Sequence, residues 1–344
     1  MASRIELLKG RIVVNPSELL SRSRATDGDI VVLSGTLLEG FGNSYSDLDL
    51  YVIGEHLPTQ GPDVPASQVL REDGRVRRVN ETLKSSSNVL LDIQYYTFQE
   101  LETLSRSLNA LYHESRLGTR IFRKTLHQDD EDLIHKLLTG TILQDASGSF
   151  DARKYFDPAT FCFLKYRNEV GGYEEFRDLI GSWMAGDLDT CLYNTRAYLV
   201  SQVTGMMFLA GSTNPRPKWF IRKLTALRPE YAELKDGILF WMNSSRHTDL
   251  QKREAIKKAC ELIDQTYAHA RMLLGTNARY FPVEEALTLT DREFAERGTP
   301  DVDTLAEWQL RRRMFRPSEP PLLLEIQKPP RENVGAAASP EMRR

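Results

Sequence analysis

The chain contains few cysteines and has no excess of basic residues. Its three cysteines, Cys162, Cys191 and Cys260, are far apart, which excludes a metal-ligand motif and indicates a reducing compartment. Lysine and arginine total 45 against 48 acidic residues, giving a net charge of −3. This balance argues against a protein built to coat nucleic acid, although it leaves a local basic groove open.

Long hydrophobic segments are also missing. The most apolar later run, Ala197 to Ala210, is short and is interrupted by Ser201, Gln202 and Thr204, so we predict a buried helix there and no membrane span. The N-terminal stretch MASRIELLKG lacks the apolar centre of a signal peptide. We therefore expect a soluble, cytoplasmic protein, whose oligomeric state the sequence does not indicate.

The length of 344 residues predicts two domains, and the 41% hydrophobic content is enough to pack their interiors. We predict an α+β protein: residues 1–112 form a small mixed β-sheet domain with flanking helices, and residues 113–314 form an all-α domain. Residues 315–344 hold six prolines and are predicted to be a partly disordered tail, in which Leu322–Ile326 is apolar enough to dock on the body.

Hydrophobic periodicity and breaker residues predict the individual elements. The predicted strands are Ile30–Ser34, Leu48–Ile53, Arg75–Leu83 and Val89–Tyr96, with a loop over Gly54–Gly74. The predicted helices are Phe98–Leu111, Asp129–Leu138, Pro158–Val170, Asp187–Gly211, Pro217–Leu227, Pro229–Asn243 and Asp249–Leu274.

The most informative segment runs from Val31 to Ile53, VVLSGTLLEGFGNSYSDLDLYVI. Because side chains alternate along a strand, Asp47 and Asp49 are expected to share one face. Two neighbouring carboxylates repel each other, and a Mg²⁺ ion between them would remove that repulsion. The pair therefore predicts a metal site at the start of a strand.

Two further features extend this site. The Gly35-Thr36 turn is predicted to open a short helix, whose backbone N–H groups and dipole would hold an anion. Asp92 lies within the apolar strand pattern VLLDIQYY, where an unpaired carboxylate would be costly. A third carboxylate beside Asp47 and Asp49 would allow two metal ions to bind close together.

A Gly-Thr turn, a spacer, Ser46-Asp47-Leu48-Asp49 and a later strand aspartate resemble the signature of the polymerase-β-type nucleotidyltransferase superfamily. Gly40 also falls where many members have glycine. The pattern covers roughly the first third of the chain. The helical remainder resembles, more loosely, the C-terminal domains of aminoglycoside nucleotidyltransferases, in which a lysine near a helix start often meets the triphosphate. Lys218 is the matching position here.

The resemblance implies a reaction and roles for the residues. Asp47, Asp49 and Asp92 would be the catalytic and metal-binding residues for two Mg²⁺ ions, with Asp92 also orienting the acceptor hydroxyl. The nucleoside triphosphate, most often ATP in this superfamily, would be bound by a second set of residues: Ser34, Gly35, Thr36, Ser46 and Lys218. The protein would move a nucleoside monophosphate to a hydroxyl group and release pyrophosphate, in a cleft between the two domains. The chain departs from many small-molecule members by having Glu39 where they have arginine.

Other interpretations stay open. Asp92 could pair with Arg75 or Arg77 on a neighbouring strand. Lys218 could be a surface lysine, with Arg222 or Lys223 in the phosphate role instead, and Glu39 could be merely solvated.

Three functions also remain. The near-neutral charge favours a transferase with a small-molecule acceptor. The alternatives are a transferase acting on a protein side chain or an RNA 3′ end, and a non-catalytic nucleotide-binding interaction protein.

Overall fold

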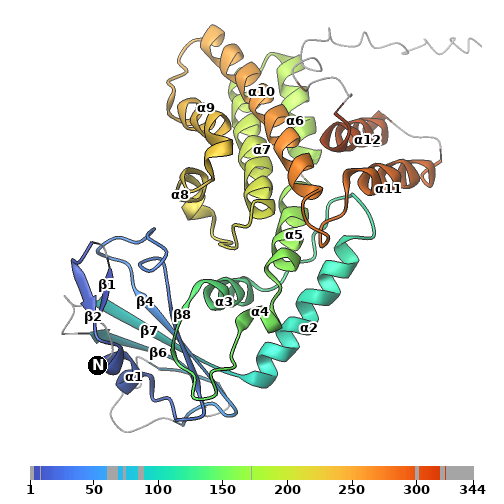
Figure 1. Cartoon of the computed structure of the whole chain (residues 1–344). Helices are drawn as coiled ribbons and strands as arrows, with labels where there is room; N and C mark the ends of the chain where they lie inside the picture. Colours follow the sequence, from blue (N-terminus) through green and yellow to red (C-terminus); the bar gives the residue numbers. More distant parts are fainter. Residues whose placement is uncertain are drawn as a thin grey trace, which may run out of the picture.

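A computed structural model describes residues 4–7, 9–59, 69–72, 75–83, 89–171, 173–298, 302–317 and 322. It confirms the predicted α+β class, with a mixed β-sheet in the N-terminal region and helices in the C-terminal region. Figure 1 shows the sheet at one end of the molecule and most helices at the other, with α2 and α5 between them.

The main sheet has six strands in the order β5-β6-β7-β4-β3-β8. Their bounds are β3 Ile30–Ser34, β4 Leu48–Gly54, β5 Val69–Glu72, β6 Arg75–Leu83, β7 Val89–Thr97 and β8 Thr141–Gln144. The central pair, β4 and β7, is parallel, and all other neighbours are antiparallel. A separate hairpin-like pair joins β1 (Ile5–Leu7) to β2 (Ile12–Val14).

Alternating side chains give the sheet two different faces. Leu48, Leu50 and Val52 enter a core shared with β1, β2 and α1 (Pro16–Ser23). Tyr51 and Ile53 enter the opposite core, which is covered by α2 (Phe98–Ser115), α3 (Gln128–Thr139), α4 (Ala152–Tyr155) and α5 (Pro158–Glu169). The aspartates share the second face, so the strand pattern itself directs them toward the helices.

The third core belongs to the C-terminal helices and surrounds α7 (Leu188–Leu209), which packs against α5, α6 (Tyr173–Ala185) and α10 (Asp249–Leu274). The 3₁₀ turns η3 (Pro217–Trp219) and η4 (Pro229–Tyr231) lead into α8 (Phe220–Thr225) and α9 (Ala232–Asn243). The last helices are α11 (Val283–Ala295) and α12 (Val302–Phe315). Among the helices that the structure describes, none combines the length and apolarity needed to cross a bilayer.

Local sequence explains several boundaries. Thr97 and Glu100 form a capping box that starts α2 where β7 ends, with the Thr97 amide donating to the Glu100 carboxylate at 2.7 Å. Asp157 caps α5 just before Pro158, a residue suited to the first helical turn. These signals place the predicted and observed starts of both helices at the same residues.

Three predictions are wrong in detail. The Gly54–Gly74 segment contains a strand, β5, whose Val69 pairs with Val79 of β6. Residues 36–40 form hydrogen-bonded turns and no α-helix, so a helix dipole offers no support for an anion there. Residues beyond 112 add one strand to the sheet, β8, which pairs with β3.

The division of the chain at residues 112 and 314 stays a prediction. Most of the predicted tail lies outside the described residues. Leu322 is described and is fully buried in the helical core, where its amide donates to Asp264 at 2.8 Å.

Candidate active site

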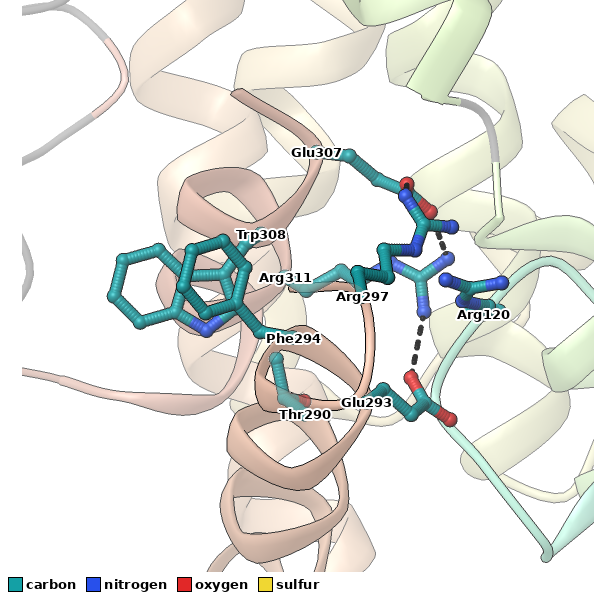
Figure 2. A pocket seen from close by; sticks show the side chains of 8 residues that line it. All are labelled: Arg120, Thr290, Glu293, Phe294, Arg297, Glu307, Trp308 and Arg311. Atoms are coloured by element: carbon teal, nitrogen blue, oxygen red, sulfur yellow. Dashed lines mark hydrogen bonds and ion pairs between the residues drawn. The ribbon is translucent and has the colours of Figure 1, made fainter. Parts of the chain in front are cut away.

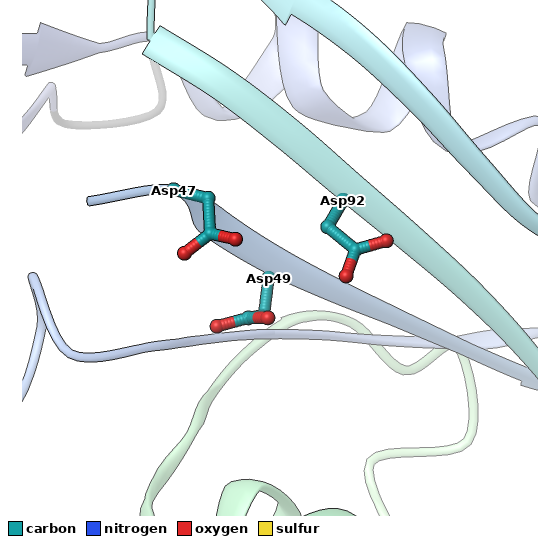
Figure 3. A group of neighbouring side chains, drawn as sticks. All are labelled: Asp47, Asp49 and Asp92. Atoms are coloured by element: carbon teal, nitrogen blue, oxygen red, sulfur yellow. The ribbon is translucent and has the colours of Figure 1, made fainter. Parts of the chain in front are cut away.

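The three predicted aspartates lie together on the helix-covered face of the sheet. Asp49 of β4 stands directly opposite Asp92 of the parallel strand β7, and Asp47 immediately precedes β4. One carboxylate oxygen of each residue lies within 4.8 Å of the others, so the group could hold a metal ion (Figure 3). Asp92 faces the cleft, not the core, although only 2% of its surface is exposed.

Asp92 is held in place by a two-pronged ion pair. The Nε and Nη2 atoms of Arg78 donate to its two oxygens at 2.7 and 2.5 Å, and Gln94 donates to one of them at 3.1 Å. Of the two predicted alternatives, Arg77 is not the partner, because it pairs with Glu100 at 2.5 Å. The side chain of Arg75 lies outside the described part of the structure.

A β-bulge explains this difference. The pairing of β5 with β6 slips beside Arg77, which interrupts the alternation of side chains and leaves Val76 and Val79 both buried. Arg78 then stands opposite Gln94, on the same face as Asp92.

Asp49 is bonded to a residue that the sequence did not single out. Lys136, near the end of α3, donates its ammonium group to Asp49 Oδ2. Burial raises the pKa of Asp49 above its ordinary value, Lys136 lowers it, and the charges of Asp47 and Asp92 raise it again. The net direction is upward, as expected for a carboxylate that lacks a fully compensating cation.

The turn after β3 brings the backbone close to the triad. Gly35 has a φ of +116°, and a Cβ atom there would lie 2.6 Å from Asp49 Oδ2. Only glycine fits this conformation and this approach without strain. Ser34, opposite Asp49 in the strand register, is 1% exposed, and its hydroxyl has no hydrogen-bond partner among the described residues.

A cleft of about 1060 Å³ opens above the triad. Its floor is the sheet, including the triad, Tyr51, Gln94 and Tyr96. Its opposite wall comes from α3 and from the segment that leads into η3, including Asp132, His135, Lys136, Asn214, Arg216, Lys218 and Trp219. The cleft thus lies between the sheet and the helices, where the sequence predicted an active site.

The wall carries several cationic groups of different exposure. Arg216 forms an ion pair with Asp132 of α3, with Nε and Oδ1 at 2.9 Å. Lys218 is exposed, and its ammonium lies 5.2 Å from the ring centre of Trp219. Arg222 does not line the cleft, and Lys223 is buried, donating to the Asn214 carbonyl at 3.0 Å. Of the three residues predicted for the phosphate role, Lys218 lines the cleft, whereas Arg222 and Lys223 do not.

Glu39 is bonded to two residues of the cleft wall and is not the solvated residue that the sequence suggested. Its side chain is 12% exposed, and one oxygen accepts from His135 Nε2 at 3.1 Å and from Asn214 at 3.3 Å. His135 also bonds the Thr213 hydroxyl at 2.8 Å. Burial alone would raise the pKa of Glu39, but the His135 and Asn214 bonds lower it overall. The network ties the turn after β3 to the helical wall.

The structure places the other predicted nucleotide-binding residues around the turn. Thr36 and Ser46 line the cleft, while Ser34 and Gly35 lie beneath it. The Ser46 hydroxyl accepts from the Asn43 amide at 3.0 Å, which shapes the loop before Asp47. The residues missed by sequence reasoning are Arg78, Lys136, His135 and Arg216. All four reach the site through contacts between segments that are apart in the sequence, and no local sequence pattern indicates them.

A second pocket, between α11 and α12, holds only about 20 Å³ (Figure 2). Arg311 fills it and bonds Glu307 at 2.5 Å and Glu293 at 3.3 Å. Burial lowers the pKa of Arg311 to about 10, and the two glutamates oppose that change. This pocket is an ion-paired contact between helices and has no room for a substrate.

Comparisons with known proteins add little. No protein-family model matches the chain, and no curated protein matches it significantly. Among solved structures, a nucleotidyltransferase-like protein from Exiguobacterium sibiricum is similar over 82% of this chain and 89% of that chain, with 14% identity and a TM-score of 0.36. A likeness this distant carries no argument, so the interpretation depends on the geometry of the site.

The donor set fits a hard divalent cation. Three carboxylates converge, and Mg²⁺ prefers oxygen ligands. The close approach of Gly35 to Asp49 Oδ2 shows that the turn packs directly against this carboxylate. Arg78 and Gln94 together take three of the roughly four lone-pair positions of Asp92, so about one position remains for a metal ion.

Proposed function

We propose that the protein is a Mg²⁺-dependent nucleotidyltransferase that moves a nucleoside monophosphate, AMP from ATP, to a hydroxyl group of a small-molecule acceptor. The observation that carries the proposal is the acidic triad at β4 and β7, with one oxygen of each carboxylate within 4.8 Å of the others, at the floor of a cleft whose opposite wall includes Lys136 and Lys218. The resemblance of the segment from Gly35 to Asp49 to nucleotidyltransferases supports the same reaction class.

Asp47, Asp49 and Asp92 would hold the metal. When bound, Mg²⁺ would supply positive charge to the phosphates and to the reacting oxygens. We propose two ions, because two metals would stabilise both the attacking and the leaving oxygen of the transferred group.

The chain's own groups would perform the remaining tasks. Ser34, Gly35, Thr36 and Ser46 surround the turn beside Asp49 and would position the triphosphate. Lys218 would bind its outer phosphates from the opposite wall. Because Arg78 and Gln94 fix the orientation of Asp92, that carboxylate would accept the proton of the acceptor hydroxyl as its oxygen attacks the α-phosphorus and pyrophosphate leaves.

The cleft supports a small acceptor. Its volume of about 1060 Å³ is close to the upper end of the volumes of small-molecule sites, and its lining mixes acidic, basic and aromatic side chains without a continuous basic track. We propose the cytoplasm as the location, because the three cysteines are all free thiols.

A non-catalytic nucleotide-binding protein is the second candidate. It is favoured by the ion pairs of Lys136 and Arg78, which compensate two of the three carboxylates without any metal.

Incubation with ATP labelled at the α- or the γ-phosphate, Mg²⁺ and three acceptor classes separates the candidates. The acceptor classes are hydroxylated small molecules, an RNA 3′ end and a protein mixture. Nucleotidyl transfer predicts that only the α-label appears on an acceptor, and the class labelled identifies the substrate. Transfer of the γ-label would refute the proposed reaction. Bound but untransferred ATP would favour the non-catalytic candidate.

A further inference from the structure

Two cations already contact the acidic triad, one from the sheet and one from the helical wall. Arg78 of β6 forms an ion pair with Asp92, and Lys136 of α3 donates a hydrogen bond to Asp49. None of the described residues forms an ion pair with Asp47. We propose that Lys136 is a built-in counterion, which holds Asp49 in the nucleotide-free protein and transfers to the triphosphate when Mg²⁺ and a nucleotide bind. That Lys136 competes with a metal ion for Asp49 is inferred from geometry. That its ammonium group then binds the triphosphate rests on the proposed function.

The two cations differ in how easily they can leave. Arg78 makes two parallel hydrogen bonds to Asp92, at 2.7 and 2.5 Å, a fork geometry that resists rotation. Lys136 makes a single bond through a compact ammonium group on a flexible four-carbon stem. Lys136 is therefore the cation that a metal ion would displace, whereas Arg78 would continue to orient Asp92.

The helix that carries Lys136 is fixed, so only the side chain needs to move. His135 is bonded to Glu39 at 3.1 Å and to Thr213 at 2.8 Å. Asp132, one turn earlier, is paired with Arg216. Lys136 itself lines the cleft with 14% of its side chain exposed. A turn of its stem keeps the ammonium within the same cleft, on the side where Lys218 is also found.

This arrangement couples metal and nucleotide binding. A Mg²⁺ ion binding alone must compete with the ammonium group for Asp49, and the displaced charge gains no new partner. When a triphosphate is also present, the displaced ammonium meets an anion. Metal affinity in the absence of nucleotide should then be weak, and each ligand should raise the affinity of the other by the same factor.

Calorimetric titration of Mg²⁺ into the nucleotide-free protein tests the competition between Lys136 and the metal ion. Lys136→Met and Lys136→Gln remove the charge and should raise Mg²⁺ affinity about tenfold or more, because a unit charge within a few ångströms of a dication interacts strongly in a partly buried site. Lys136→Arg keeps the charge and should leave the affinity low. Lys124→Met removes a lysine that is paired with Glu114 outside the cleft, and it should change nothing.

Repeating the titrations with α,β-methylene-ATP, a non-hydrolysable analogue, tests the transfer of the ammonium group to the triphosphate. The wild-type protein should show mutual enhancement of Mg²⁺ and analogue binding, and Lys136→Met should lose most of it. Mg²⁺ binding that is unchanged or undetectable in both Lys136→Met and Lys136→Gln, with folding verified by circular dichroism, overturns the counterion role. Raised Mg²⁺ affinity without any analogue binding would refute the proposed function and leave the counterion role intact.

Discussion

Replacement of Gly35 by alanine should weaken both the stability of the protein and its affinity for a metal ion, because Gly35 packs against the acidic triad. The added Cβ would lie 2.6 Å from Asp49 Oδ2, well inside van der Waals contact, and would sit at a φ of +116°. Gly40→Ala is the matched control, because Gly40 has a φ of +75° in the same turn but nothing within 4 Å of its Cβ position. Both variants place a Cβ atom at a positive φ, and only Gly35→Ala adds the clash.

The magnitudes follow from these two effects. A left-handed backbone costs a non-glycine residue about 1–2 kcal/mol, which sets the expected loss of unfolding free energy for Gly40→Ala. Overpacking adds about 1–3 kcal/mol, so Gly35→Ala should lose about 2–5 kcal/mol. Rotation of the Asp49 carboxylate would relieve the clash, and it would move a metal ligand out of its position in the triad. Mg²⁺ affinity should therefore fall in Gly35→Ala.

Chemical denaturation and Mg²⁺ calorimetry measure the two effects separately. Gly40→Ala should be slightly destabilised and should keep the metal affinity of the wild type. If Gly35→Ala matches Gly40→Ala in both measurements, the turn does not support Asp49 in the manner described.

Three further predictions follow from the site and the helical wall. Asp92→Asn should reduce turnover by about 100-fold or more while ATP affinity largely survives, because Asp47 and Asp49 remain; loss of ATP binding in this variant, measured by calorimetry, would reverse the assigned roles. Lys218→Ala should raise the Michaelis constant for ATP about threefold to tenfold in steady-state kinetics. An equal rise in that constant when an arginine outside the cleft is replaced would indicate a general charge effect. Burial disfavours the charge of Lys223 and lowers its pKa from 10.5 to about 8, although the charge of Glu169 opposes this change. Between pH 8 and 10.5 the unfolded state therefore binds more protons than the folded state. Across that window the unfolding free energy of the wild type should rise by at most about 3 kcal/mol relative to Lys223→Met, and parallel pH profiles of the two proteins would contradict the burial argument.

The sequence was informative about the triad because strand geometry is local. The two-residue period of a strand places Asp47 and Asp49 on one face and turns Leu48 and Leu50 to the other, and the structure has this arrangement. The apolar run around Asp92 likewise marked a buried strand. The parallel contact of β4 with β7, which brings Asp49 opposite Asp92, depends on strand order, and the local pattern of either strand does not determine that order.

The partners of the triad could not be predicted for physical reasons. Lys136 reaches Asp49 because α3 packs across the sheet face, a contact between residues far apart in the chain. Arg78 replaces Arg77 at Asp92 because a bulge shifts the alternation of β6 by one residue. Glu39 looked solvated because its partners, His135 and Asn214, come from distant segments.

Electron paramagnetic resonance of Mn²⁺ in the presence of α,β-methylene-ATP would show directly whether the acidic triad binds metal together with a nucleotide. Mn²⁺ accepts the same oxygen ligands as Mg²⁺, and its free and bound forms give distinguishable signals. If the triad is a two-metal nucleotide site, the wild type binds two Mn²⁺ ions per chain with the analogue, Asp92→Asn binds one, and a variant with both Asp47→Asn and Asp49→Asn binds none. Absence of bound Mn²⁺ in the wild type, or equal binding in all three proteins, would contradict the account.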